Sequence, residues 1–432
     1  MPLTPAWVQM RPHPVQSRLW RTPSRFVSVA AGRGSGKTDI ARKRVVRFLP
    51  VRKPWADPMY FYALPTYAQA KRVAWYKLLE LIPDNWIKGE PNKTDLVIHT
   101  VFGSSLHVVG MDKPARIEGN QWDGGVKDES CDHKPGAFSR SVSPALSHRD
   151  GWCWRIGVPK RYGPGAIEFR QWCEQDGVEH FHWSSEDILT PEQLAWAKEH
   201  TDPIDYDEQY RANWHRAGGL VFFAFGTENV SKEAVYRPDL PILIGSDFNV
   251  NPMCWCMAHE VDGKLHVFDE LFMRDCNTRM ALDALNLRYG RHQAGWRFYG
   301  DAAGRARDTS ASESDYLQIE NDERFKPKRV IYPRANPARR DRFAACNMMF
   351  QNAAGERRVL VHPKCNRVIA DHLIRAYDES GTEPNDSDDV GHMSDALGYL
   401  IHSRYPIKRI IKKAASLGIY DGGKNSPATP QW

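Results

Sequence analysis

Residues 31–38 read AGRGSGKT, a glycine-rich run that ends in Lys37 and Thr38. This is the pattern of a phosphate-binding loop that has alanine at its first position. Glycines let successive backbone N–H groups turn toward one concave spot, where they hold phosphate oxygens. The lysine supplies charge to the outer phosphates, and the hydroxyl completes the oxygen shell of Mg²⁺. The predicted nucleotide-binding residues are Ala31, Gly32, Arg33, Gly34, Ser35, Gly36, Lys37 and Thr38.

The segments on either side of the loop agree with this interpretation. Residues 24–31 form a short β-prone run, and residues 38–49 carry apolar side chains at helical spacing. A phosphate-binding loop requires this strand before it and this helix after it. Short motifs also occur by chance, so a plain glycine turn is the alternative. The flanking pattern favours nucleotide binding.

Composition limits the class of protein. A chain of 432 residues predicts two or three domains, and 41% hydrophobic with 26% charged residues is typical of a soluble globular protein. The net charge of +6 permits a polyanionic partner without requiring one. Residues 1–14 lack the apolar core of a signal peptide, and no window resembles a membrane span. We therefore expect the protein to act in a cytosol, without a membrane partner.

The order of segments predicts an α/β fold with two domains. Residues 1–215 alternate strand-like and helix-like segments, which favours a mainly parallel sheet. The alternation of strand-like and helix-like segments stops over residues 216–240, which we interpret as a linker. A second block, residues 241–405, contains a hairpin predicted to turn at Asp262 and Gly263. Residues 406–432 are basic, then polar and rich in glycine and proline, and are predicted to form a flexible tail.

A nucleotide hydrolase also needs carboxylates opposite the loop. In the run VKDES, Asp128 is the candidate for the Mg²⁺ shell and Glu129 for polarising the attacking water. The preceding residues 120–126 are polar for a buried strand, so an exposed acidic turn is the alternative.

Three acids in the second block end hydrophobic runs or lie on a late helix. Asp247 and Asp301 close strand-like runs, and Asp395 lies on a helical segment. If three carboxylates converge, a cation must offset their repulsion, and two Mg²⁺ or Mn²⁺ ions held in this way can cleave a phosphodiester. Glu270 is a candidate for a further ligand. The alternatives to Asp395 are Asp388 and Asp389.

Several motifs in this order resemble those of the large terminase subunit of tailed bacteriophages, the motor that packs DNA into procapsids. The loop is similar to the family's Walker A motif, with its internal basic residue. The other motifs that carry the resemblance are HPVQSRLW at 13–20, YALPTYAQAKR at 62–72, RIEG at 116–119 before KDE at 127–129, GVPKRYGPGAIEFRQW at 157–172, and DEQYRANWHRAGGLVFFAF at 207–225. The acids of the second block resemble the family's nuclease site in their order along the chain. The resemblance covers roughly residues 10–405.

This resemblance implies a P-loop NTPase domain of the ASCE/RecA-like class followed by an RNase H-like nuclease domain. It implies ATP with Mg²⁺ in the first site and Mg²⁺ or Mn²⁺ in the second. Gln16 would sense adenine, and Arg33 or Arg116 would act as an arginine finger. The family's coupling motif has Thr or Ser before its proline, whereas residues 157–159 read Gly-Val-Pro. Sensing of the γ-phosphate by a hydroxyl at this position is therefore in doubt.

The resemblance also implies partners and a place of action. The partners would be double-stranded DNA, the portal protein, a small terminase subunit and further copies of the chain in a pentameric ring. The protein would act in the host cytoplasm, transiently at the procapsid portal, and would be absent from the mature virion. Contacts to the DNA backbone are expected from Arg339, Arg340 and Arg342. Two alternatives stay open: an ATP-dependent nuclease or helicase of DNA repair, and a nucleotide-regulated DNA-binding scaffold without nuclease activity.

Overall fold

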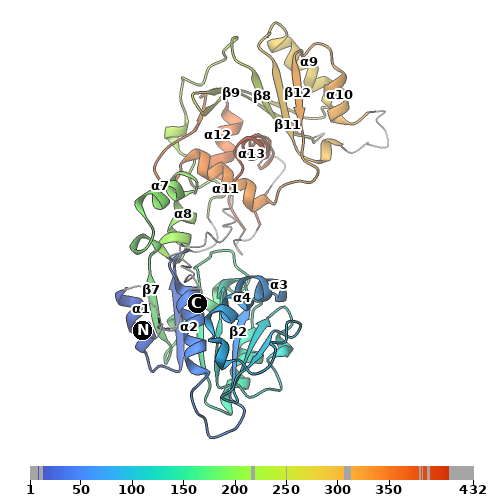
Figure 1. The fold of residues 1–432 in the computed structure, drawn as a ribbon. Coiled ribbons are helices and arrows are strands. Elements are labelled where there is room, and N and C mark those ends of the chain that lie inside the picture. Colours follow the sequence, from blue (N-terminus) through green and yellow to red (C-terminus); the bar gives the residue numbers. More distant parts are fainter. Residues whose placement is uncertain are drawn as a thin grey trace, which may run out of the picture.

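The computed structural model contains two α/β units, each built around one sheet (Figure 1). The first sheet uses strands from residues 26–183, and the second uses strands from residues 242–361. The described residues are 8, 13–215, 219–249, 251–305, 313–378, 381, 383–386 and 390–407. The predicted tail lies outside the described residues from position 408 onward.

The first sheet has seven strands in the order β3-β4-β2-β5-β6-β1-β7. Its neighbouring strands are parallel except for β3 and β4, which form an antiparallel hairpin. Since β6 lies between β1 and β5, the segments that follow these three strands meet at one edge of the sheet. The strands are β1 (Phe26–Ala31), β2 (Met59–Leu64), β3 (Val97–His99), β4 (Ser105–Gly110), β5 (Gly124–Lys127), β6 (Trp152–Gly157) and β7 (Glu179–Trp183).

The helices of this unit follow the predicted periodicity. Helix α2 (Lys37–Phe48) begins inside the phosphate-binding loop and buries its apolar face against the sheet. The predicted helix after β2 forms as α3 (Tyr67–Gln69) and α4 (Tyr76–Leu81), joined by a π-helical segment. The remaining helices are α1 (Pro14–Arg21), α5 (Ser143–Ser147), α6 (Ala166–Glu174), α7 (Pro191–Glu199) and α8 (Pro203–Tyr206).

Strand β5 is buried although its sequence, GGVK, is polar. A Cβ atom on Gly124 would lie 2.4 Å from a ring carbon of Trp152, and one on Gly125 would lie 2.5 Å from the ring of Phe61. Aromatic rings of the neighbouring strands β6 and β2 therefore occupy the space that side chains on β5 would fill. As a result Asp128 is buried at the end of the strand, so the alternative of an exposed acidic turn is wrong.

The second sheet has six strands in the order β12-β11-β8-β9-β10-β13. Strand β9 is antiparallel to both β8 and β10, and its hairpin turns at the predicted Asp262 and Gly263, both of which have positive φ. The remaining pairs are parallel. The strands are β8 (Ile242–Asp247), β9 (Met253–Val261), β10 (Lys264–Met273), β11 (Trp296–Gly300), β12 (Lys328–Ile331) and β13 (Val359–Val361).

Two apolar cores cover the faces of this sheet. Leu243 belongs to the core with α11 and α13, whereas its neighbours Ile242 and Ile244 belong to the core with α9 and α10. This alternation is the period of a strand buried on both faces. Within the described ranges, no helix has the length and apolar character needed to cross a membrane. The helices are α9 (Thr278–Tyr289), α10 (Asp315–Asn321), α11 (Arg339–Phe350), α12 (Asn366–Ile374) and α13 (His392–Arg404).

The segment that leads into the second sheet packs onto the second unit. Val221 and Phe222 are buried in the core with α11 and α13. The side chain of Asn347 on α11 donates to the carbonyl of Val221 at 2.9 Å and accepts from the N–H of Ala224 at 3.2 Å. The predicted linker 216–240 is therefore in large part a packed portion of the second unit.

Replacing Asn347 with alanine is expected to destabilise the second unit by about 2–3 kcal/mol, because two buried backbone groups lose their partner. Chemical denaturation of the full chain measures this loss. The matched control is Asn321→Ala, since Asn321 is exposed and bonds only to the side chain of Glu313 in the part of the chain described. If Asn321→Ala lowered the free energy of unfolding as much as Asn347→Ala, this would contradict the role of Asn347 in holding residues 221–224 on the second unit.

Candidate active sites

The phosphate-binding loop has the backbone that its glycines predict. Gly34 and Gly36 have φ of 76° and 84°, values that favour glycine. A Cβ atom on Gly32 would lie 2.2 Å from Oγ of Ser185 and 2.3 Å from the carbonyl oxygen of Tyr210. These glycines therefore allow both the turn of the loop and the close approach of the segments that brace it.

Lys37 is buried at the start of α2 and folds back onto the loop. Its Nζ donates to the carbonyl of Gly32 at 3.3 Å. Burial lowers the pKa of Lys37, while the charges of Glu129 and Asp128 raise it. The ammonium group is therefore close enough to both acids for their charges to act on it.

The two acids after β5 have different surroundings. One carboxylate oxygen of Asp128 accepts from the hydroxyl of Tyr62 at 2.7 Å, and the other accepts from the N–H of Glu129 at 2.8 Å. Glu129 has a left-handed backbone with φ of 54°, an unusual conformation for a residue with a side chain. Burial raises the pKa of Glu129, and the charge of Lys37 lowers it. Asp128 is thus oriented by fixed donors, as a metal ligand requires, and Glu129 has the raised basicity that helps a general base.

Gln16, the predicted adenine sensor, lies against the loop. Its Nε2 donates to the carbonyl of Ser35 at 2.8 Å, and the indole N–H of Trp183 donates to the same oxygen at 3.0 Å. The structure therefore gives Gln16 the role of bracing the loop, and its recognition of adenine stays a prediction.

The two candidate arginine fingers occupy different places. Arg33 is exposed on the loop, and its backbone N–H donates to the carbonyl of Gln209 at 2.6 Å. Arg116 follows β4, where it lies 3.9 Å from Asp112. Strand β4 is four positions from β1, a separation of about 19 Å at the usual strand spacing. Arg33 therefore lies on the loop of its own chain, whereas Arg116 follows a strand distant from that loop, and the role of either as an arginine finger stays a prediction.

Lys160 is a basic residue near this site that the sequence analysis did not single out. It follows β6, and its Nζ lies 2.5 Å from a carboxylate oxygen of Asp132. Its charge lowers the pKa values of Glu129 and Lys37. A cavity of about 780 Å³ is bordered by Lys160, Asp132, Arg33 and Gly34, and reaches Arg340 of the second unit. The only sequence signal for Lys160 was its place directly after Pro159, in the segment that resembles the coupling motif.

In the second unit, Asp247 and Asp301 lie side by side. Asp247 ends β8 and Asp301 follows β11, and these parallel neighbours pair Ser246 with Gly300. Burial, together with the charge of Asp247, raises the pKa of Asp301 to about 6. Oδ1 of Asp301 is buried without a hydrogen-bond partner among the described residues. Two buried carboxylates with an unsatisfied oxygen suit a divalent cation.

Asp395 reaches the same region but is held by two arginines. Its Oδ1 lies 2.6 Å from Nη1 of Arg375 and 2.8 Å from Nη2 of Arg342, and both guanidinium groups are buried. The charge of Asp395 raises the pKa of Asp247, so the acids are close enough to interact. Nevertheless, no group of three or more His, Cys, Asp or Glu side chains in the described ranges could hold a metal ion. Arginines neutralise Asp395 in this structure, and the gathering of three acids around shared ions stays a prediction.

The other predicted residues of this site are found elsewhere or lie outside the description. Glu270 on β10 accepts from the backbone N–H groups of Arg367 and Val368, at 3.0 and 2.9 Å. Its carboxylate caps the N-terminus of α12 in this structure, and its role as a metal ligand stays a prediction. His392 lies 3.0 Å from Asp247 instead, and this carboxylate raises its pKa. The alternatives Asp388 and Asp389 lie outside the described residues.

The three arginines at the start of α11 have different surroundings, since Arg339 and Arg340 are exposed and Arg342 is buried. Arg342 is buried on Asp395, and Arg339 pairs with Glu383 at 3.2 Å. The guanidinium of Arg340 lies 5.3 Å from the ring of Tyr162 in the first unit. The prediction that all three arginines contact DNA is wrong for Arg342, because its charge is neutralised inside the second unit.

Comparison with known proteins finds large terminase subunits. The chain is 25% identical over 289 residues to the large terminase subunits of Thermus virus P23-45 and Thermus phage G20c, an alignment that covers 56% of this chain and 58% of each relative. No family model matches the chain. The solved large terminase of a thermophilic bacteriophage has the same fold, with a TM-score of 0.54 and 16% identity over 91% of this chain and 99% of that one.

The chain is similar to the phage large terminases in sequence and in fold. The expected resemblance and the expected fold class, a P-loop NTPase domain followed by a nuclease domain, are confirmed. The aligned region spans somewhat more than half the length of the Thermus terminases, 58%. The terminase of the thermophilic bacteriophage has also been solved with ADP and with ATP-γ-S, and these structures have TM-scores of 0.52 and 0.51 to this chain.

Proposed function

We propose that the chain is a large terminase subunit that drives viral double-stranded DNA into a procapsid with ATP and cuts concatemeric DNA with a metal-dependent endonuclease. One observation carries this proposal. The same chain holds a phosphate-binding loop whose Lys37 faces Asp128 and Glu129, and a second sheet that places Asp247 beside Asp301. One site suits a nucleotide with its Mg²⁺, and the other suits divalent ions at a phosphodiester.

In the ATPase site, Lys37 and the N–H groups of the loop bind the phosphates. Thr38 and Asp128 hold Mg²⁺, which supplies charge to the phosphate oxygens when bound. Glu129 accepts a proton from the attacking water, a role that its raised pKa supports. Arg33 or, from a neighbouring subunit, Arg116 adds positive charge as the bond to the terminal phosphate breaks.

In the nuclease site, Asp247 and Asp301 hold Mg²⁺ or Mn²⁺, with two ions as the expected number. Asp395 lies beside them, and Arg342 and Arg375 fix its position and neutralise its charge. His392 holds one oxygen of Asp247, which orients the carboxylate. When bound, the metal would supply the charge that makes a water nucleophilic toward the phosphodiester, and Asp247 and Asp301 would hold and orient it.

The proposal includes partners. The motor moves double-stranded DNA, and the nuclease cuts it. The protein should contact the DNA backbone without reading the bases, so DNA binding should weaken steeply as the salt concentration rises. The portal protein and a small terminase subunit complete the machine, and a pentameric ring of this chain works on the procapsid. The place of action is the host cytoplasm, transiently at the portal vertex and not in the mature virion.

The test uses the purified protein in three assays. We expect ATP hydrolysis with Mg²⁺, plasmid cleavage with Mn²⁺, and uptake of DNA into portal-bearing procapsids, measured by protection from added nuclease. ATPase activity stimulated by free DNA ends without any need for portal or procapsid would support a repair nuclease or helicase instead. Absence of cleavage, with Asp247→Ala unchanged from wild type, would support a DNA-binding scaffold.

A further inference from the structure

The segment 157–162 leaves the sheet between the two halves of the ATPase site. It follows β6, which lies between β1 with its loop and β5 with its acids. Lys160 therefore emerges at the same edge as both, with its side chain 20% exposed. The hydroxyl expected before Pro159 is absent, so a different group must sense the terminal phosphate if this segment does so.

Lys160 borders a cavity beside the phosphate-binding loop, which Lys37, Thr38, Asp128 and Glu129 do not line. Together with Arg33 and Gly34 of the loop it lines the cavity of about 780 Å³. Its Nζ pairs with Asp132, which lies four residues after Asp128 and is one-third exposed. Both side chains are mostly buried, so breaking the pair leaves Asp132 without its cation. Only a more highly charged anion, such as a terminal phosphate, can draw Lys160 away from it.

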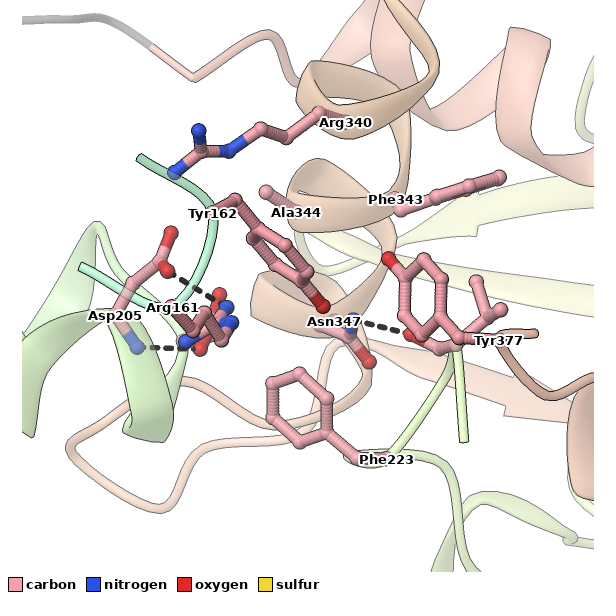
Figure 2. A pocket seen from close by; sticks show the side chains of 11 residues that line it. Arg161, Tyr162, Asp205, Phe223, Arg340, Phe343, Ala344, Asn347 and Tyr377 are labelled. Carbon is pink, nitrogen blue, oxygen red and sulfur yellow. Dashed lines mark hydrogen bonds and ion pairs between the residues drawn. The ribbon is translucent and has the colours of Figure 1, made fainter. Parts of the chain in front are cut away.

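The two residues after Lys160 hold the segment in place (Figure 2). Arg161 forms ion pairs with Asp205 at 2.8 Å and Glu208 at 3.2 Å, and its N–H also donates to Glu208 at 2.8 Å. The ring of Tyr162 lies 5.7 Å from that of Tyr377 in the second unit. The backbone that carries Lys160 is thus fixed immediately beyond this residue, which reduces the entropy lost when the side chain binds a ligand.

We propose that Lys160 breaks its ion pair with Asp132 and binds the terminal phosphate of the nucleotide. It thereby takes the place of the missing hydroxyl of the coupling motif. The ammonium group donates to a γ-phosphate oxygen and adds charge opposite the bond that breaks. Because ADP has no γ-phosphate, Lys160 returns to Asp132 when the phosphate leaves. This inference rests on the proposed ATPase function.

The experiment compares the binding of ATP-γ-S and ADP, each with Mg²⁺, to the full-length chain by titration calorimetry. Lys160→Ala should weaken ATP-γ-S about 10- to 100-fold and leave ADP within about twofold, and it should lower kcat for ATP about 100-fold. Lys160→Arg keeps the charge and should recover part of both losses. Asp132→Asn should bind ATP-γ-S as tightly as wild type or tighter, because it frees Lys160. The matched control is Lys77→Ala, an exposed lysine on α4 paired with Glu80.

Three results would overturn this role of Lys160. The first is equal weakening of ADP and ATP-γ-S by Lys160→Ala, and the second is no weakening of either. The third is a loss in Asp132→Asn equal to that in Lys160→Ala, which would make the ion pair itself the functional unit. Wild-type protein that binds neither nucleotide would instead overturn the proposed ATPase function. Circular-dichroism melting of each variant shows whether a loss reflects unfolding.

Discussion

Replacing Lys37 with alanine is expected to lower ATP turnover by roughly 10³-fold or more, the scale for losing a preorganised group at a developing charge. Lys37 is buried 3.3 Å from the carbonyl of Gly32 and faces Asp128 and Glu129. Burial lowers its pKa, but these acids favour the charged form. Without the ammonium group of Lys37, the carboxylates of Asp128 and Glu129 would repel the phosphates, and no positive side chain would lie between them. Steady-state phosphate release by the full-length chain measures the effect.

The control for this prediction is Arg47→Ala. Arg47 lies on the same helix α2, but it is exposed and donates to the carbonyl of Trp20. It should retain turnover within about twofold. Both variants should cleave plasmid with Mn²⁺ as well as wild type does, because the acids that hold the metal belong to the second sheet. Loss of cleavage together with ATP turnover in a folded Lys37→Ala variant would argue against two separate sites.

Replacing Asp301 with asparagine should have the second large effect, a loss of Mn²⁺-dependent cleavage by roughly 10³-fold with ATP turnover retained. The amide is isosteric, but it lacks the charge that attracts a divalent ion beside Asp247. Cleavage of supercoiled plasmid measures the loss. The control is Asp283→Asn, because Asp283 is an exposed acid on α9 that pairs with Arg324. Cleavage that survives in Asp301→Asn would remove Asp301 from the site.

The same variant should be more stable than wild type when metal is absent. The pKa of Asp301 rises from 3.8 to about 6 on folding, so the folded state favours the protonated form. Ionisation of this carboxyl therefore costs stability as the pH rises from 3.8 to 6, and the full cost remains above that range. We expect Asp301→Asn to melt at a higher temperature than wild type at pH 8, and the difference to vanish near pH 4.

Divalent metal should reverse this order. Metal binding requires the ionised carboxylate, so Mn²⁺ should raise the melting temperature of wild type and not of Asp301→Asn. For the same reason, Mn²⁺ binding by wild type should weaken as the pH falls, because protonation of Asp301, whose pKa without metal is about 6, competes with the ion. A melting temperature of Asp301→Asn that is equally raised by Mn²⁺ would place the ion elsewhere.

Local sequence was sufficient for the parts of both sites that follow directly from a strand. The glycines at 32, 34 and 36 determine a loop that few other sequences allow, and Lys37 follows at a fixed spacing. Asp247 and Asp301 end apolar runs, and the carboxyl ends of adjacent parallel strands bring them together. In each case the functional group is positioned by its own strand, so the pattern of nearby residues predicts its place.

Tertiary structure decided where a side chain meets a partner distant in sequence. Strand β5 is buried because Trp152 and Phe61 fill the space above Gly124 and Gly125, which no pattern within the strand reveals. Glu270 was predicted to bind metal but caps α12.

The charged partners of Asp395 and Lys160 were likewise decided by the tertiary structure. Asp395 is neutralised by Arg342 and Arg375, which come from two other helical segments. Lys160 faces the ATPase site because β6 inserts between β1 and β5, although its sequence neighbours indicate only a loop. The sequence by itself determined the two folds, the loop and the strand-end acids, since these depend on local periodicity and backbone freedom. Which charges meet depends on packing between distant segments, and only the tertiary structure determines it.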